Sequence, residues 1–99
     1  MKIVYDGKTL DFDLEEITVS QATVLKRKLW LTLLALDKGL IEGDPDALRA
    51  VYWLIQEQSG NKVDIDLVDF KIVKLANAIQ EAVEAEAALA EEDEAPKGE

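Results

Sequence analysis

The stretch from Gly43 to Gly60, GDPDALRAVYWLIQEQSG, constrains the fold most, because it carries signals for both ends of one helix. Asp44 is suited to accept a hydrogen bond from a free backbone N–H as the N-cap. Pro45 fits the first helical position, where a missing N–H costs nothing. Gly60 is suited to the left-handed conformation that ends many helices. These signals predict a helix over residues 44–60.

The apolar residues of this predicted helix share one face, with a single large exception. The face follows the three-four spacing of a buried helix surface and holds Ala47, Leu48, Val51, Leu54, Ile55 and Gln58. Trp53 lies nearly opposite the middle of that face, at about 100° per residue. The helix is therefore expected either to sit between two layers or to present an aromatic side chain to a partner.

Met1 to Leu14 are predicted to form a β-hairpin. Asp6-Gly7 is a strong signal for a two-residue type I′ turn between two apolar runs. An isolated hairpin is marginal in water, so its apolar face must cover helices or pair with strands of another subunit. The register set by this loop pairs Tyr5 with Lys8, Ile3 with Leu10 and Met1 with Phe12.

A helix is predicted over residues 18–42, since Thr18 and Gln21 have the spacing of a capping box. Its segment from Leu29 to Leu36 is apolar on most of its circumference, so the helix is either central to the domain or carries a subunit contact. The main apolar stripe holds Ala22, Leu25, Leu29, Leu33, Leu36 and Leu40. A second stripe, about 100° round the helix, holds Trp30, Leu34 and Ile41.

The remaining chain completes a prediction of the α+β class. Residues 69–90 have the apolar spacing of a last helix, and residues 61–69 fit either a short strand or an extended connector. We therefore predict an N-terminal β-hairpin followed by a small bundle of three helices, over about 18–42, 44–60 and 69–90. Residues 1–90 are expected to form one domain, and residues 91–99 an acidic, disordered and flexible tail.

Composition excludes several functional classes. The chain has neither cysteine nor histidine, which removes thiolate chemistry, the usual general base and the commonest metal ligand. The formal net charge is −10, and eight of the 21 acidic residues lie in residues 81–99 with a single lysine, which disfavours binding to nucleic acid. The longest uncharged run is far below the ~20 residues that a membrane span needs. We expect a soluble, non-enzymatic protein without a cofactor.

The sequence offers surface for binding protein more than it offers chemistry. The spacing Asp64-x-Asp66-x-x-Asp69 lacks the glycine and the closing glutamate of a calcium loop, and it is interpreted as a set of turn and cap residues. We predict no catalytic, cofactor or metal site. For the aromatic residues, core packing is the alternative to partner contact. The residues predicted to contact a partner are Trp30, Leu34, Ile41, Tyr52 and Trp53.

A series of short motifs runs in order from Asp11 to Phe70. It comprises Asp11-Phe12-Asp13-Leu14, Ile17-Thr18-Val19, Lys26-Arg27, Leu31-Thr32, Gly39-Leu40, Gly43-Asp44-Pro45-Asp46-Ala47-Leu48, Val51 with Trp53-Leu54, and Val68-Asp69-Phe70. In order and spacing, the series resembles the short tail assembly chaperones of long-tailed bacteriophages, especially those that infect actinobacteria. None of these motifs is catalytic.

The resemblance implies a chaperone that binds the long, helical, apolar tape-measure protein and keeps it soluble and extended during tail tube assembly. It implies self-association as well, action in the cytoplasm of the bacterial host, and absence from the mature virion. Neither nucleic acid nor a membrane is expected as a partner. The alternatives are a structural virion component, such as a tail connector or tube subunit, and an acidic inhibitor or mimic protein.

Two details bear on the resemblance. The family has a Thr-Gly break after the basic residues, whereas this chain has Leu29-Trp30, which predicts that one helix runs through. Such chaperones are often made in two lengths by a programmed frameshift near the end of the short form. Ala95-Pro96-Lys97 is compatible with a slippery codon run, and the codons would decide whether a longer form exists.

Overall fold

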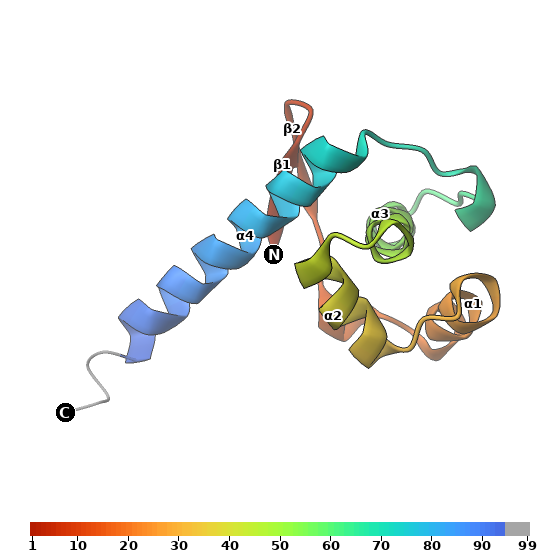
Figure 1. The fold of residues 1–99 in the computed structure, drawn as a ribbon, viewed down its shortest axis with the longest axis horizontal. Helices are drawn as coiled ribbons and strands as arrows, with labels where there is room; N and C mark the ends of the chain where they lie inside the picture. The colour runs from red at the N-terminus through yellow and green to blue at the C-terminus, as the bar shows by residue number, and fades with distance from the viewer. Residues whose placement is uncertain (95–99) are drawn as a thin grey trace.

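The computed structural model describes residues 1–94, with side chains through Leu89 (Figure 1). The α+β class and the N-terminal hairpin are confirmed, but the described residues form four α-helices where three were predicted. Two short 3-10 helices, η1 and η2, lie in the connections. The elements are β1 (Lys2–Tyr5), β2 (Lys8–Asp11), η1 (Leu14–Glu16), α1 (Val19–Leu29), α2 (Leu33–Glu42), α3 (Pro45–Gln58), η2 (Ile65–Leu67) and α4 (Ile72–Glu94).

The hairpin has the predicted turn and register. Asp6 and Gly7 both have positive φ, 52° and 77°, as a type I′ turn requires. The Cα pairing sets Tyr5 opposite Lys8 and Ile3 opposite Leu10. Met1 and Phe12 extend the pairing: the Phe12 N–H donates to the Met1 carbonyl over 2.9 Å, and the Met1 amino group donates to the Phe12 carbonyl over 2.8 Å. The hairpin is not left alone, because α4 packs along β1.

Helix α3 is the centre of the fold, with α1, α2 and α4 around it (Figure 1). Asp44 caps it as predicted, its side chain accepting from the Ala47 N–H over 3.1 Å, and Gly60 follows it with φ of 87°. Residues on most of its circumference are buried, so α3 sits between layers. Its buried residues are Ala47, Leu48, Ala50, Val51, Trp53, Leu54 and Ile55.

The prediction of a single helix over residues 18–42 is wrong, because the chain breaks there into α1 and α2. Trp30 ends α1 in the left-handed conformation (φ 58°, ψ 29°), and its N–H donates to the carbonyls of Leu25 and Lys26. Gly43 holds the same conformation at the end of α2, with φ of 72°. This conformation costs a residue with a Cβ roughly 1–2 kcal/mol, so Trp30 occupies a position that favours glycine.

The two residues after Trp30 explain why the break forms without glycine. Leu31 is buried in the core, and its N–H donates to the Leu25 carbonyl over 3.2 Å. Thr32 is the N-cap of α2, and its hydroxyl accepts from the Ala35 N–H over 3.1 Å. A cap contributes about 1 kcal/mol and burial of a leucine roughly 1.5–3 kcal/mol, which together exceed the cost of a left-handed tryptophan.

We expect Trp30→Gly to raise the free energy of unfolding by about 1 kcal/mol, because glycine adopts positive φ without a Cβ clash. The indole is 80% exposed, so its loss removes little from the core. Urea denaturation followed by circular dichroism measures the change. The reverse substitution at the end of α2, Gly43→Ala, has open space around its new Cβ. It is expected to lower the free energy of unfolding by about 1 kcal/mol, because Gly43 has positive φ. A Trp30→Gly protein less stable than the wild type would contradict strain at Trp30.

The boundary between the last helix and the tail differs from the prediction. Helix α4 spans Ile72–Glu94, so residues 91–94, predicted to be part of a flexible tail, are helical. Residues 95–99, including the Ala95-Pro96-Lys97 run, lie outside the described residues. Residues 61–69 form an extended connector containing η2, and no strand pairing is formed within this described segment.

Candidate functional site

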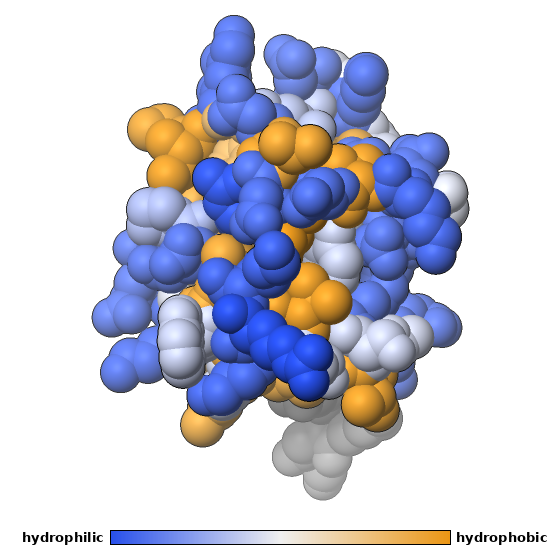
Figure 2. Space-filling view, turned by 90° about the vertical axis from the view of Figure 1, so that its right-hand side faces the viewer, coloured by the Kyte–Doolittle hydropathy of each residue, from blue (hydrophilic) through white to orange (hydrophobic). Residues whose placement is uncertain are grey.

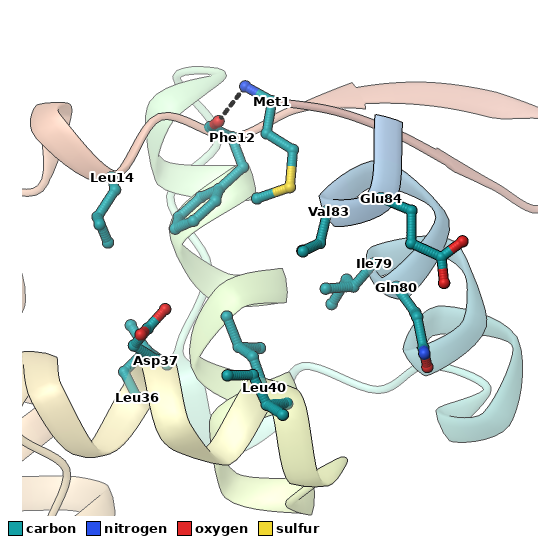
Figure 3. A pocket seen from close by; sticks show the side chains of 11 residues that line it. Met1, Phe12, Leu14, Leu36, Asp37, Leu40, Ile79, Gln80, Val83 and Glu84 are labelled. Atoms are coloured by element: carbon teal, nitrogen blue, oxygen red, sulfur yellow. Dashed lines mark hydrogen bonds between the residues drawn. The ribbon is translucent and has the colours of Figure 1, made fainter. Parts of the chain in front are cut away.

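An apolar groove opens between α2, α4 and the chain that leaves β2, with a volume of about 270 Å³ (Figure 3). Phe12, Leu36 and Ile79 form its depth and are almost fully buried. Ile41 and Val83 stand at its mouth, with exposed fractions of 80% and 47%. The complete lining is Met1, Phe12, Leu14, Leu36, Asp37, Leu40, Ile41, Ile79, Gln80, Val83 and Glu84.

The groove exists because α2 and α4 pack against different parts of the fold. Helix α2 lies close to α3, where a Cβ on Gly39 would come within 2.7 Å of the Ala47 Cβ. Helix α4 packs mainly along β1 and makes few contacts with α2. Leu36 and Leu40 therefore face Ile79 across a gap that no other described element fills (Figure 3).

A second hollow of about 360 Å³ continues from the groove and shares Met1, Phe12, Leu14 and Val83 with it. The cation among the described lining residues is the Met1 amino group, which lies 3.5 Å from Glu86 Oε1 and 4.0 Å from Asp11 Oδ1. The groove is therefore apolar inside and negatively charged at its edge. The polar residues that line the two hollows are Asp13, Glu15, Asp37, Gln80, Glu84 and Glu86.

The outer side of α2 adds apolar surface beside the groove. Leu34 and Ile41, which we name the α2 stripe, have exposed fractions of 82% and 80%. Ile41 belongs to both surfaces, because it also lines the groove. The face that carries α1 is different: Figure 2 shows mainly hydrophilic side chains there, with hydrophobic ones in separate small groups.

The five residues predicted to contact a partner do not all share one surface. Leu34 and Ile41 share the α2 stripe, and Ile41 also lines the groove. Trp30 lies at the junction of α1 and α2 with 80% of its surface exposed. Trp53 is only 5% exposed, and its indole N–H donates to the Val63 carbonyl over 2.8 Å. It belongs to the core, so the interpretation of Trp53 as a surface aromatic is corrected.

Tyr52 also packs within the fold. Its ring stacks on Phe70, with centroids 5.4 Å apart, and meets Tyr5 edge to face at 6.0 Å. The Tyr5 hydroxyl accepts from the Lys71 N–H over 2.8 Å, so this cluster joins the hairpin, α3 and the start of α4. Tyr52 is half-buried as a result, which leaves less of its ring for a partner than the sequence suggested.

Sequence reasoning did not identify most of the groove lining as a site. Met1 and Phe12 were expected only as a pair in the hairpin, and Val83 falls only within the range of the predicted last helix. The available signal was the number of apolar stripes, which exceeds what a small core encloses. That signal does not say which stripes stay uncovered.

The carboxylates of the connector serve local structure. Asp64 Oδ1 accepts from the Asp66 N–H over 2.9 Å, and Asp69 Oδ1 accepts from the Phe70 N–H over 3.0 Å. Asp66 binds Lys28 Nζ at 2.9 Å, and this hydrogen bond, with the charge of Asp66, raises the pKa of Lys28 above its usual value. Among the described residues, no group of three acidic side chains is placed to hold a metal ion.

Comparison of the chain with protein-family models, with curated proteins and with solved structures finds no match. Within residues 1–94, no helix is both long and apolar enough to cross a membrane. The features of the chain that bear on function are therefore the groove, the α2 stripe and the motif series of the sequence.

Proposed function

We propose that this protein is a non-enzymatic tail assembly chaperone of a long-tailed bacteriophage, which binds the tape-measure protein and keeps it soluble and extended. The observation that carries the proposal is the apolar surface formed by the groove and the α2 stripe, which the described elements leave uncovered. A helix that lays its apolar face into such a groove is a common mode of recognition between proteins. The motif series from Asp11 to Phe70 supports the choice of partner.

The proposal places the protein in the host cytoplasm during assembly and not in the finished particle. A chaperone must release its client when the tail tube forms, so exposed contacts of moderate affinity suit it. Large amounts of the protein in purified virions would instead favour a connector or tube subunit, and would overturn the chaperone proposal.

Co-expression with a fragment of the tape-measure protein tests the proposal. The wild-type protein is expected to keep the fragment in the soluble fraction, and Leu34→Asp and Ile41→Asp are expected to reduce its affinity about tenfold or more, because each places a charge in an apolar contact. Leu34 is 82% exposed, so its substitution leaves the fold intact.

The matched control is Val19→Asp, which alters an equally exposed apolar residue (84%) on α1, outside the groove lining. It is expected to behave as the wild type. A fragment that aggregates as completely with the wild-type protein as without it would overturn the proposal. Equal losses for all three variants would show that the effect is general and not specific to the α2 stripe.

A further inference from the structure

We infer that the groove takes an amphipathic helix of the partner whose apolar face is flanked by lysine or arginine residues. The inference rests on the proposed function and specifies its site. It is drawn from the shape of the groove, from the backbone groups around it and from the charges at its edge.

The shape of the groove fits a helix. One wall of the groove is α2, which has 10 residues and is therefore about 15 Å long. Leu36 and Leu40 lie one turn apart along this wall, and Ile79 and Val83 lie one turn apart on the opposite wall (Figure 3). Ile41 also lines the groove. Apolar side chains spaced by one helical turn on both walls match the three-four spacing of an amphipathic helix placed between them.

The backbone groups around the groove favour a helix over an extended peptide. An extended peptide needs partners for its own N–H and C=O groups, which a free strand edge would supply. Two walls are helices, whose backbone groups are already paired within the helix. Along the third side, the chain that leaves β2, the Phe12 carbonyl accepts from the Met1 amino group over 2.8 Å and the Asp13 N–H donates to Gln58 Oε1 over 3.0 Å. A helix satisfies its own backbone groups, so it is the peptide conformation that fits here.

The charges at the edge of the groove favour a basic helix. The polar side chains at the two hollows are five carboxylates and one amide, Asp13, Glu15, Asp37, Glu84, Glu86 and Gln80, with no lysine or arginine among the described lining residues. The Met1 amino group already lies within 4.0 Å of Glu86 and Asp11. The carboxylates would repel an acidic helix and attract a basic one, and this sets specificity and association rate more than affinity.

Two synthetic peptides of 15 residues test the inference. Both carry leucines at three-four spacing; one has lysines beside the leucines and the other has glutamates at the same positions. We expect the lysine peptide to bind, and the glutamate peptide to bind at least tenfold more weakly, by fluorescence anisotropy at low salt. Backbone amide shifts of the labelled protein are expected to change at Phe12, Leu40 and Val83. A glutamate peptide that binds as tightly would overturn the inference.

Two triple variants with equal net charge separate the groove from the bulk charge of the chain. The variant Asp37→Asn/Glu84→Gln/Glu86→Gln is expected to bind the lysine peptide about tenfold more weakly than the wild type does. Asp6→Asn/Asp46→Asn/Glu57→Gln removes three carboxylates that are outside the lining and is expected to leave binding unchanged. Equal losses in both variants would overturn the inference, as would equal binding of a scrambled peptide that has the same composition but no apolar face.

A second copy of the chain is the main rival occupant, because Lys26 and Arg27 are exposed near Trp30. Self-association that blocks peptide binding and disappears in Lys26→Glu/Arg27→Glu would assign the groove to that copy and overturn the inference. If the groove triple variant still keeps the tape-measure fragment soluble, the chaperone proposal stands and the inference about the groove fails. If the lysine peptide occupies the groove while the fragment aggregates, the inference stands and the chaperone proposal fails.

Discussion

Replacing Trp53 with alanine is expected to lower the free energy of unfolding by about 3–5 kcal/mol. The side chain is 95% removed from solvent on the side of α3 that the connector covers, and its N–H is hydrogen-bonded to the Val63 carbonyl at 2.8 Å. The substitution would leave a cavity between α3 and the connector. A domain of this size is stable by roughly 5–15 kcal/mol, so the loss would unfold a large fraction of the protein at moderate temperature.

Urea denaturation followed by far-ultraviolet circular dichroism measures this loss. Trp53→Phe is the graded control: it keeps most of the apolar volume but removes the donor to Val63, with an expected cost of about 1–3 kcal/mol. Trp30→Ala is the control for residue type, because Trp30 is 80% exposed, and it is expected to change stability by less than about 0.5 kcal/mol. Equal effects of the two alanine substitutions would contradict the assignment of Trp53 to the core.

The parts of the fold governed by neighbouring residues were predictable. The Asp6-Gly7 turn sets the hairpin register, because only a two-residue loop with positive φ at both positions joins these strands. The ends of α3 follow from Asp44 and Gly60 for the same local reason. The helical pattern also placed Trp53 opposite the main buried face. Of the two interpretations of that position, the structure has the helix between two layers.

The break at Trp30 was not predictable from periodicity. The apolar stripes of α1 and α2 continue in phase across residues 29–33, and tryptophan is not a residue that signals a left-handed helix end. Thr32 was the available signal, since a threonine before an apolar run is a typical N-cap. Whether this N-cap signal outweighs the continuous apolar stripe depends on the burial of Leu31, which is a tertiary contact.

The groove was unpredictable for a similar reason. Its lining residues were recognised as apolar faces, but a face becomes a groove only when the neighbouring helix lies elsewhere. That placement depends on the approach of α2 to α3 at Gly39 and on the packing of α4 along β1, and both contacts join residues distant in sequence. Tyr52 shows the same limit, because its position against Phe70 and Tyr5 could not be read from α3 alone.

Gly39→Ala is expected to lower the free energy of unfolding by about 1–2 kcal/mol, although alanine is the better helix former by about 1 kcal/mol. The added Cβ would stand 2.7 Å from the Ala47 Cβ and 3.4 Å from the Asp44 Cβ. The distance to Ala47 is shorter than an ordinary van der Waals contact. Helix α2 would have to move away from α3. Because α2 is a wall of the groove, binding of the lysine peptide is expected to weaken as well.

The double variant Gly39→Ala/Ala47→Gly tests this contact directly. Ala47→Gly alone is expected to cost about 1 kcal/mol, since it removes a buried methyl group and weakens the first turn of α3. In the double variant the methyl group moves from α3 to α2, so the two losses of stability should not add. The double variant is expected to be about 1–3 kcal/mol more stable than the sum of the two single changes predicts. The double-mutant cycle is measured by urea denaturation of all four proteins. Additive losses would mean that α2 is not positioned by the contact between Gly39 and Ala47, and the groove would then need a different structural explanation.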